Sequence, residues 1–474
     1  MHTSLRALWP ALLVLSACDG VSATRGTPSS LPDGSSPGAS PDGGTASTHD
    51  QARSTLALDP ASGLAPAALG VAVAANNAFA VDLYSRIRAG ASGRNLMTSP
   101  LSASVALTMA YAGARGTTAT EMAAALHFDP SAASIFDGQN ALLQALAARA
   151  PAALAQVTQV ATQAGEPDAA PLPTSFVLDL VNSLWGQSSY PWAQPFLDRM
   201  ARTYGAGVFL EDFAAGGDAP RVAINGWVAG QTGNTIQDLL PVGSLDASTR
   251  MVLVNATQLK MPWSLPFDPG ATAPATFTRG DGTAVTTSFM HMEESFFYAD
   301  DGQAQTVALN LGGDQLTVVF TLPHGDLTTY EAALTQGTIP APQVPATHNW
   351  VNLSIPTANV TSPTLSLADA LKAMGMRTTF QEGQADFSGL CASAPDGGQL
   401  YVGDIFQKAM FSMDEGGVEA AAATAVVISL FSGPGPSVPT VTLDRPFLAS
   451  IVDQPTGAIL FMGEIGDPSD HGGP

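Results

Sequence analysis

The sequence FSMDEGGVEAAAATAVVISLFSGPGP, residues 411–436, contains two conflicting conformational signals. Four consecutive alanines at 420–423 favour an α-helix, because alanine has the highest helix propensity. Two glycines at 416–417 precede them and let the chain change direction. The β-branched residues at 426–428 follow, and they favour a strand. A plain surface helix is therefore a poor description of this stretch.

Side chains alternate between the two faces of a strand, and this stretch sorts cleanly by that rule. Over residues 418–430 the only charged residue, Glu419, falls on one face with Ala421, Ala423, Ala425 and Ser429. The opposite face carries seven uncharged residues: Val418, Ala420, Ala422, Thr424, Val426, Ile428 and Leu430. The pattern predicts a segment with two stable placements, an exposed loop and a strand buried between two neighbours.

The rest of the chain is globular and acidic. It has 474 residues, of which 45% are hydrophobic and 12% charged, so it can bury a large core. The formal net charge is −22, which argues against nucleic acid, heparin-like polyanions and anionic membrane surfaces as partners.

Helix signals dominate the first third of the globular part. Apolar residues recur every four positions over 79–87, which is typical of an amphipathic helix. Ser99-Pro100 is typical of the start of a second helix. The threonines at 117–118, followed by Glu121, resemble a capping box. Residues 150–175, rich in Ala, Pro and Gln without a clear pattern, are predicted to be an inserted loop.

Strand signals dominate after that. Apolar runs at 176–184, 251–259 and 315–322 and a pair of runs within 451–463 each suit a buried strand. Helices followed by many strands predict one mixed α+β domain over residues 71–468, with a short tail at 469–474.

The N-terminus predicts export and anchoring. Residues 1–17 resemble a signal peptide, with Arg6 before an apolar run, and the run ends in Leu-Ser-Ala before Cys18. This is typical of a bacterial lipoprotein, in which Cys18 receives the lipid. The alternative is an ordinary signal peptide with an incidental cysteine. Residues 18–70, rich in Pro, Gly and Ser, are predicted to be a flexible tether, so we expect a membrane-bound protein of the cell envelope.

The sequence contains none of the common catalytic signatures. It has no G-K pair of a phosphate loop, no C-x-x-C and no H-E-x-x-H. His291 beside Glu293 and Glu294 lacks metal-ligand spacing, and Cys391 is most simply a small buried residue. We therefore expect no cofactor, no metal and no enzymatic activity, although a surface hydrolase stays open as an alternative.

Ordered motifs along the whole domain resemble the serpins, the serine-protease-inhibitor family. They are NLMTSPLS (95–102), GARGTT (113–118), NGWV (225–228), TGNTI (232–236), VLVNA (252–256), DRPF (444–447) and LFMG (460–463). The resemblance implies N-terminal helices packed on a large central β-sheet, smaller sheets, and an exposed reactive-centre loop at about 415–440.

The resemblance also assigns residues in that loop. The family's hinge corresponds to Glu415, Gly416, Gly417, Val418, Glu419, Ala420, Ala421, Ala422, Ala423 and Thr424. Counting along the loop as inhibitory members do, the bond that a protease cuts corresponds to Phe431–Ser432.

Two further groups correspond to residues that control opening of the central sheet. The family's shutter corresponds to Ser99, Ser102, Asn255 and Gln407, and its breach aromatic to Trp263. The usual shutter histidine is Gln407 here. Glutamine does not titrate, so the resemblance does not carry a pH-gated shutter over to this chain.

The function that the resemblance implies is suicide inhibition. A chymotrypsin-like or subtilisin-like protease would be trapped as a covalent complex on a monomeric inhibitor. A non-inhibitory serpin that acts as a binding module is the alternative. The small hinge residues argue against it, because non-inhibitory members commonly carry bulky, charged or proline residues there.

Overall fold

The computed structural model describes residues 49–65, 67–90, 95–129, 134–164, 176–391, 399–418 and 438–470. Its central sheet has eight strands in the order β1-β4-β3-β5-β14-β13-β11, with β12 paired to β13. The strands are β1 (Gln51–Ala52), β3 (Val177–Gln187), β4 (Val208–Glu211), β5 (Met251–Pro262), β11 (Ala358–Thr361), β12 (Leu365–Ser366), β13 (Ile405–Met413) and β14 (Gly417–Val418).

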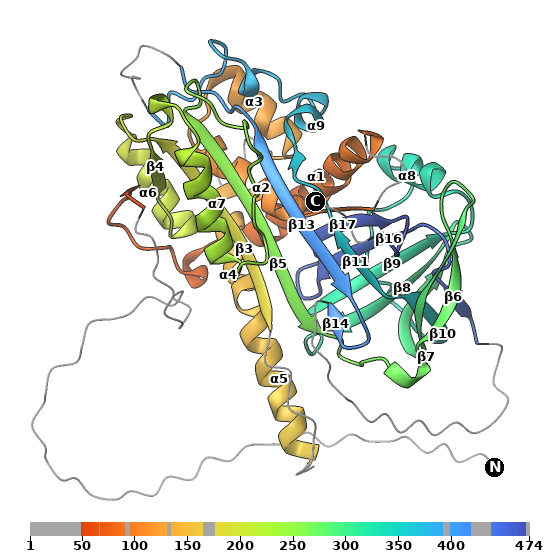
Figure 1. The fold of residues 1–474 in the computed structure, drawn as a ribbon. Helices are drawn as coiled ribbons and strands as arrows, with labels where there is room; N and C mark the ends of the chain where they lie inside the picture. Colours follow the sequence, from red (N-terminus) through yellow and green to blue (C-terminus); the bar gives the residue numbers. More distant parts are fainter. Residues whose placement is uncertain are drawn as a thin grey trace, which may run out of the picture. The chain divides into compact units, whose positions relative to one another are not determined.

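A second sheet of nine strands lies beside it (Figure 1). Its order is β15-β10-β7-β8-β9-β16-β17-β2, with β6 paired to β7. The strands are β2 (Leu96–Thr98), β6 (Ala273–Thr278), β7 (Ala284–Asp300), β8 (Ala304–Leu311), β9 (Leu316–Pro323), β10 (His348–Pro356), β15 (Thr440–Thr442), β16 (Phe447–Asp453) and β17 (Ala458–Ile465).

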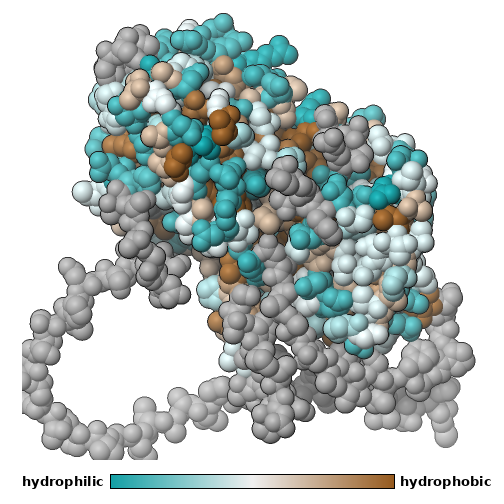
Figure 2. Space-filling model, viewed as in Figure 1, coloured by the Kyte–Doolittle hydropathy of each residue, from teal (hydrophilic) through white to brown (hydrophobic). Residues whose placement is uncertain are grey.

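Helices cover both sheets. They are α1 (Ala68–Gly90), α2 (Pro100–Tyr111), α3 (Gly116–Ala125), α4 (Ile135–Ala147), α5 (Arg149–Ala164), α6 (Gln194–Tyr204), α7 (Ala219–Gln231), α8 (Leu327–Thr335) and α9 (Ala368–Ala373). Short 3-10 turns lie at Ala61–Gly63, Phe213–Ala215, Pro269–Ala271 and Thr378–Phe380. On the face seen in Figure 2, apolar residues appear in small patches separated by polar ones.

Helix α2 is the centre of the core. Residues 100–110 are all buried, and the helix packs against β3, β5 and β17. A helix that is buried all round needs no polar face, which explains its run of Ala, Leu, Val and Met. The predicted α+β class is confirmed. The apolar runs predicted as buried strands form β3, β5, β9, β16 and β17, although residues 177–182 of β3 are only half-buried. In the part of the chain that the structure describes, no helix is both long enough and apolar enough to cross a membrane.

The predicted tether is wrong for its C-terminal part. Gln51 and Ala52 add strand β1 to the edge of the central sheet, opposite Phe209 and Val208 of β4. Asp59 forms an ion pair with Arg202 of α6 at 2.9 Å. These are backbone and polar contacts, which hold a segment without any apolar periodicity, so composition alone misses them. Residues 1–48, including Cys18, lie outside the described residues.

The predicted loop at 150–175 is wrong up to residue 164. Those residues form helix α5, and 165–175 lie outside the described residues. Alanine supports a helix through propensity alone, without an amphipathic pattern. Ala153 is fully buried, and Arg149 in the first turn pairs with Asp453 of β16 at 2.6 Å.

The predicted capping box is also wrong. Helix α3 begins at Gly116 after Arg115, with no side-chain cap. Glu121 instead accepts hydrogen bonds from the backbone N–H groups of Arg377 and Thr378, at 2.8 and 2.7 Å. Its partners lie 256 and 257 residues away in the chain, so the local sequence does not reveal them.

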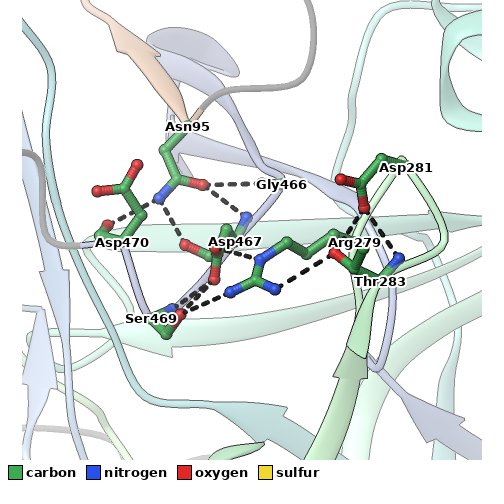
Figure 3. Close-up of polar contacts among 8 residues, drawn as sticks. All are labelled: Asn95, Arg279, Asp281, Thr283, Gly466, Asp467, Ser469 and Asp470. Atoms are coloured by element: carbon green, nitrogen blue, oxygen red, sulfur yellow. Dashed lines mark hydrogen bonds and ion pairs between the residues drawn. The ribbon is translucent and has the colours of Figure 1, made fainter. Parts of the chain in front are cut away.

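The C-terminal segment is fastened to the domain beyond the predicted boundary at 468. Arg279, in the turn between β6 and β7, pairs with Asp467 and donates to Ser469 Oγ at 3.4 Å (Figure 3). Asn95 Nδ2 donates to the carbonyl of Asp470 at 2.9 Å. Ser469 and Asp470 are therefore part of the folded domain.

A buried charge cluster lies between α1, α8 and β17. Arg88 of α1 pairs with Glu464 of β17 and, at 3.4 Å, with Glu331 of α8. Tyr84 donates to Glu331 at 2.5 Å. Burial, opposed by the positive charge of Arg88 and reinforced by the negative charge of Glu331, raises the pKa of Glu464 to about 7.

This cluster predicts a loss of stability as pH rises. Glu464 binds its proton more tightly in the folded chain than in the unfolded chain, where its pKa is about 4.3. The stabilisation from this bound proton is complete below pH 4 and is lost as pH rises through 7. The free energy of unfolding then falls by up to about 3 kcal/mol. Thermal unfolding at pH 5 and pH 8 measures this, and Glu464→Gln removes that part of the pH dependence. Exposed Glu382→Gln is the control, and identical pH profiles for Glu464→Gln and the unsubstituted protein would contradict the prediction.

Candidate functional site

The hinge begins with a tight turn after β13. The Asp414 carboxylate accepts hydrogen bonds from the backbone N–H groups of Gly416 and Gly417, at 2.8 and 3.2 Å. Burial raises the pKa of Asp414, although both of these hydrogen bonds lower it. Gly417 has a φ of +155°, and a Cβ there would lie 2.4 Å from the carbonyl oxygen of Met261. Only glycine fits at this position.

Trp263 and the segment after it hold the turn in place. The Trp263 indole N–H donates to the carbonyl of Asp414 at 2.8 Å, and the Trp263 backbone N–H donates to the carbonyl of Gly416 at 2.9 Å. Phe267 N–H donates to the carbonyl of Glu415, and Thr272 Oγ1 donates to the Glu415 carboxylate at 2.6 Å. Trp263 therefore lies directly on the hinge.

Strand β14 already occupies the middle of the central sheet. Val418 is opposite Met261 of β5 on one side and Met413 of β13 on the other, and all three are buried. Further along, β5 and β13 pair directly with each other in parallel, from Leu253–Ile405 to Thr257–Ala409. The two strands thus separate toward the end at which β14 lies between them (Figure 1).

Gln407 of β13 joins β5 and β13 in the region where these two strands pair directly. It is fully buried and makes four hydrogen bonds. Its Oε1 accepts from Thr98 Oγ1 at 2.5 Å and from Ser99 N at 3.1 Å. Its Nε2 donates to the carbonyl of Ser99 at 2.7 Å and to Asn255 Oδ1 at 2.9 Å. Gln407 therefore links β13 both to β5 and to the start of α2.

The other residues predicted for the shutter extend this network. Ser99 caps α2, its Oγ accepting from Ser102 N at 3.4 Å and donating to the carbonyl of Leu460 at 2.9 Å. Ser102 Oγ and Asn255 Nδ2 both donate to Asn182 Oδ1, at 2.9 and 3.2 Å. The structure brings Ser99, Ser102, Asn255 and Gln407 together, while Trp263 lies apart from them, at the hinge.

Two members of the network were not predicted from the sequence. Thr98 precedes the helix cap, and Asn182 lies in the middle of the apolar run that became β3. An asparagine within an otherwise mostly apolar run was the available signal, because an amide placed inside a sheet requires hydrogen-bond partners.

We predict that Gln407→Leu destabilises the protein by about 3 kcal/mol or more, since it leaves several buried polar groups without a partner. Thermal unfolding of the variant measures the effect. Gln384→Leu, at an exposed turn residue, is the matched control and changes the midpoint little. A Gln407→Leu protein as stable as the control would contradict the role of the network.

The remaining predicted site residues lie outside the described residues. They are Cys18, the hinge residues Glu419, Ala420, Ala421, Ala422, Ala423 and Thr424, and the bond between Phe431 and Ser432. Within the described ranges, no three His, Cys, Asp or Glu side chains gather as a metal ion requires.

Comparison with known proteins gives one consistent result. Residues 74–468 match the family Serpin (serine protease inhibitor). Iris from Ixodes ricinus is 32% identical over 399 residues, covering 82% of this chain and 96% of Iris. Leukocyte elastase inhibitor from Homo sapiens is 30% identical over 413 residues, covering 83% of this chain and 98% of the leukocyte elastase inhibitor chain.

Solved structures show the same fold. Tengpin, a thermophilic serpin in its native state, matches with a TM-score of 0.68 at 24% identity, over 83% of this chain and 94% of tengpin. Human thyroxine-binding globulin matches with a TM-score of 0.68 at 26% identity, over 85% of this chain and 99% of the globulin chain. The chain belongs to the serpin family.

Proposed function

We propose that the protein inhibits serine proteases as a suicide substrate, by insertion of its cleaved loop into the central sheet. The protease serine attacks the carbonyl carbon of Phe431, and an ester bond forms between them. The Phe431–Ser432 peptide bond breaks, and Ser432 leaves as a free amine. The loop then continues β14 between β5 and β13, carrying the protease with it before water hydrolyses the ester.

The strand register is the observation that carries this proposal. Thr424 is six residues after Val418 in the chain. If the strand continues antiparallel to both β5 and β13, the residues opposite Thr424 are six positions before those opposite Val418. Six residues back from Met261 is Asn255, and six residues back from Met413 is Gln407. Asn255 and Gln407 are already opposite each other where β5 and β13 pair. The two registers agree, so one inserted strand fits both neighbours.

This register places small side chains where the core has little room. Ala422 falls between Thr257 and Ala409, both buried. Thr424 falls at the hydrogen bond between Gln407 Nε2 and Asn255 Oδ1, and its hydroxyl can both donate and accept. Insertion thus breaks this bond and supplies a polar group to each partner.

A cavity of about 490 Å³ lies where the inserted strand would end. Met251 and Gly403 both line it, and they are the residues opposite Ile428 in the same register. The cavity provides space for the apolar end of the loop.

The energy of insertion is large. About ten new ladder hydrogen bonds at roughly 0.5–1.5 kcal/mol each stabilise the inserted form by on the order of 5–15 kcal/mol. The intact protein is then kinetically trapped rather than at its lowest free energy.

The proposal also covers the cellular location of the protein and the class of protease that it inhibits. Phe431 at the cut bond suits chymotrypsin-like or subtilisin-like proteases, which accept large apolar residues. We place the inhibitor in the cell envelope, anchored through lipid on Cys18, where it meets secreted proteases. Because a formal charge of −22 disfavours binding to polyanions, we expect no heparin-like cofactor.

The test is to mix the protein with chymotrypsin and run a denaturing gel. We expect a band at the summed mass that survives denaturation, and mass spectrometry of the released C-terminal peptide should begin at Ser432. Loop cleavage without such a band would favour the non-inhibitory binding module instead.

A further inference from the structure

Three aromatic side chains lie together on the outer face of the second sheet. Phe297 of β7 is opposite His348 of β10, and their ring centres are 3.8 Å apart. Trp350 follows on the same face, opposite Ser295, and is 48% exposed. Val351, which points the other way, is fully buried in the core. Trp350 is therefore a large apolar side chain presented to solvent on a rigid strand.

A cavity of about 190 Å³ opens beside the rings of Phe297 and His348. Phe297 and His348 form one wall, and Leu265 and Asp314 also line it. Asp314 accepts a hydrogen bond from Asn310 Nδ2 at 2.8 Å, which fixes its carboxylate. An aromatic wall with a carboxylate nearby suits a guanidinium or ammonium group.

The charge of the surrounding surface points to the same kind of partner. Strands β6, β7, β10 and β15 contain no lysine or arginine. Glu293 lies on the outer face of β7, opposite Asn352, diagonally adjacent to Trp350. This face therefore attracts basic groups.

The reactive-centre loop returns to the domain next to this face. Asn352 N–H donates to the carbonyl of Pro439 at 2.9 Å, so the chain leaving the loop runs beside β10. Phe431 is seven residues before Val438, a span of at most about 25 Å. A protease of some 230 residues is about 40 Å across, so one bound at Phe431 can reach Trp350.

We propose that Phe297, His348 and Trp350, with the cavity that ends at Asp314, form a second contact surface for the attacking protease. Trp350 packs against an apolar part of the protease near its active site, and the cavity takes a basic side chain from its rim. This inference rests on the proposed function, and it adds a determinant of protease choice outside the loop.

The test compares Trp350→Ala and Asp314→Asn with the unsubstituted protein in reaction with chymotrypsin. Asp314 has a φ of +66°, which asparagine also tolerates, so Asp314→Asn keeps the turn. The measured quantity is the second-order rate constant for loss of the intact loop, counting cleaved and trapped products together. We expect about a tenfold decrease for Trp350→Ala and about a threefold decrease, with a weaker salt dependence, for Asp314→Asn.

Two control variants lie away from the proposed surface. Val222→Ala removes an apolar side chain that is 57% exposed on α7, and Glu382→Gln removes an exposed charge in the turn after α9. Both should keep the original rate constant, and all four variants should keep the thermal midpoint.

The outcomes separate the two proposals. If Trp350→Ala and Asp314→Asn react as fast as the controls, the contact surface is wrong, whether or not a covalent complex forms. If the loop is cut without a covalent complex, the suicide mechanism fails. A slower loss of the intact loop for the two variants would still support the contact surface.

Discussion

We expect Ala422→Glu to give a protein whose loop is cut by the protease without trapping it. In the inserted register, residue 422 lies between Thr257 and Ala409, which are 1% and 0% exposed. A carboxylate forced into this position loses its hydration without gaining a partner, at a cost of several kcal/mol. Insertion then becomes slower than hydrolysis of the acyl-enzyme. We expect the yield of covalent complex on a denaturing gel to fall by at least about tenfold.

The neighbouring residue provides a matched control. Ala421→Glu adds the same side chain to the opposite face of the strand, which also carries Glu419. Its neighbours there are the polar side chain of Gln258, which is 8% exposed, and the half-buried Met410, whereas Thr257 and Ala409 are 1% and 0% exposed. This variant should keep most of its trapping. Equal trapping by both variants would show that the inserted strand does not follow the register of β14.

The second large effect concerns the choice of protease. Phe431→Arg should move inhibition from chymotrypsin to trypsin, because the side chain at the cut bond fills the specificity pocket of the protease. We expect the inhibition rate to change by about a hundredfold for each enzyme, in opposite directions.

Ser429→Arg is the control for Phe431→Arg, since it adds the same charge two residues earlier and should leave the preference for chymotrypsin. Inhibition of chymotrypsin that survives Phe431→Arg unchanged would rule out cleavage at the Phe431–Ser432 bond.

The sequence alone was sufficient to predict the elements whose own residues show a clear pattern. The apolar runs of β5 and β9 are buried almost throughout, so the pattern of side chains alone locates them. Glycine at 417 was expected at a hinge, and the structure supplies the reason, which is the close approach of the Met261 carbonyl.

Other elements depend on partners that are distant in the chain. Strand β1 exists because β4 offers an edge, and Glu121 serves a turn near Thr378 rather than its own helix. Asn182 joins this hydrogen-bond network only because β3 pairs with β5 and packs against α2. A local pattern contains no information on such pairings, so they appear only in the folded structure.

The position of β14 is the clearest case. The alternation of side chains indicated that the stretch suits a buried strand, but it did not indicate between which neighbours. The pairings of Val418 with Met261 and Met413 supply that answer for β14, and the proposed inserted strand continues their register.

The most direct measurement of loop insertion is the thermal midpoint of the protein before and after its reactive-centre loop is cut. Insertion adds a full strand to the central sheet, so we expect the midpoint to rise by at least about 10 °C, with Ala422→Glu losing most of this rise. An unchanged or lower midpoint after cleavage would contradict insertion, and with it the suicide mechanism.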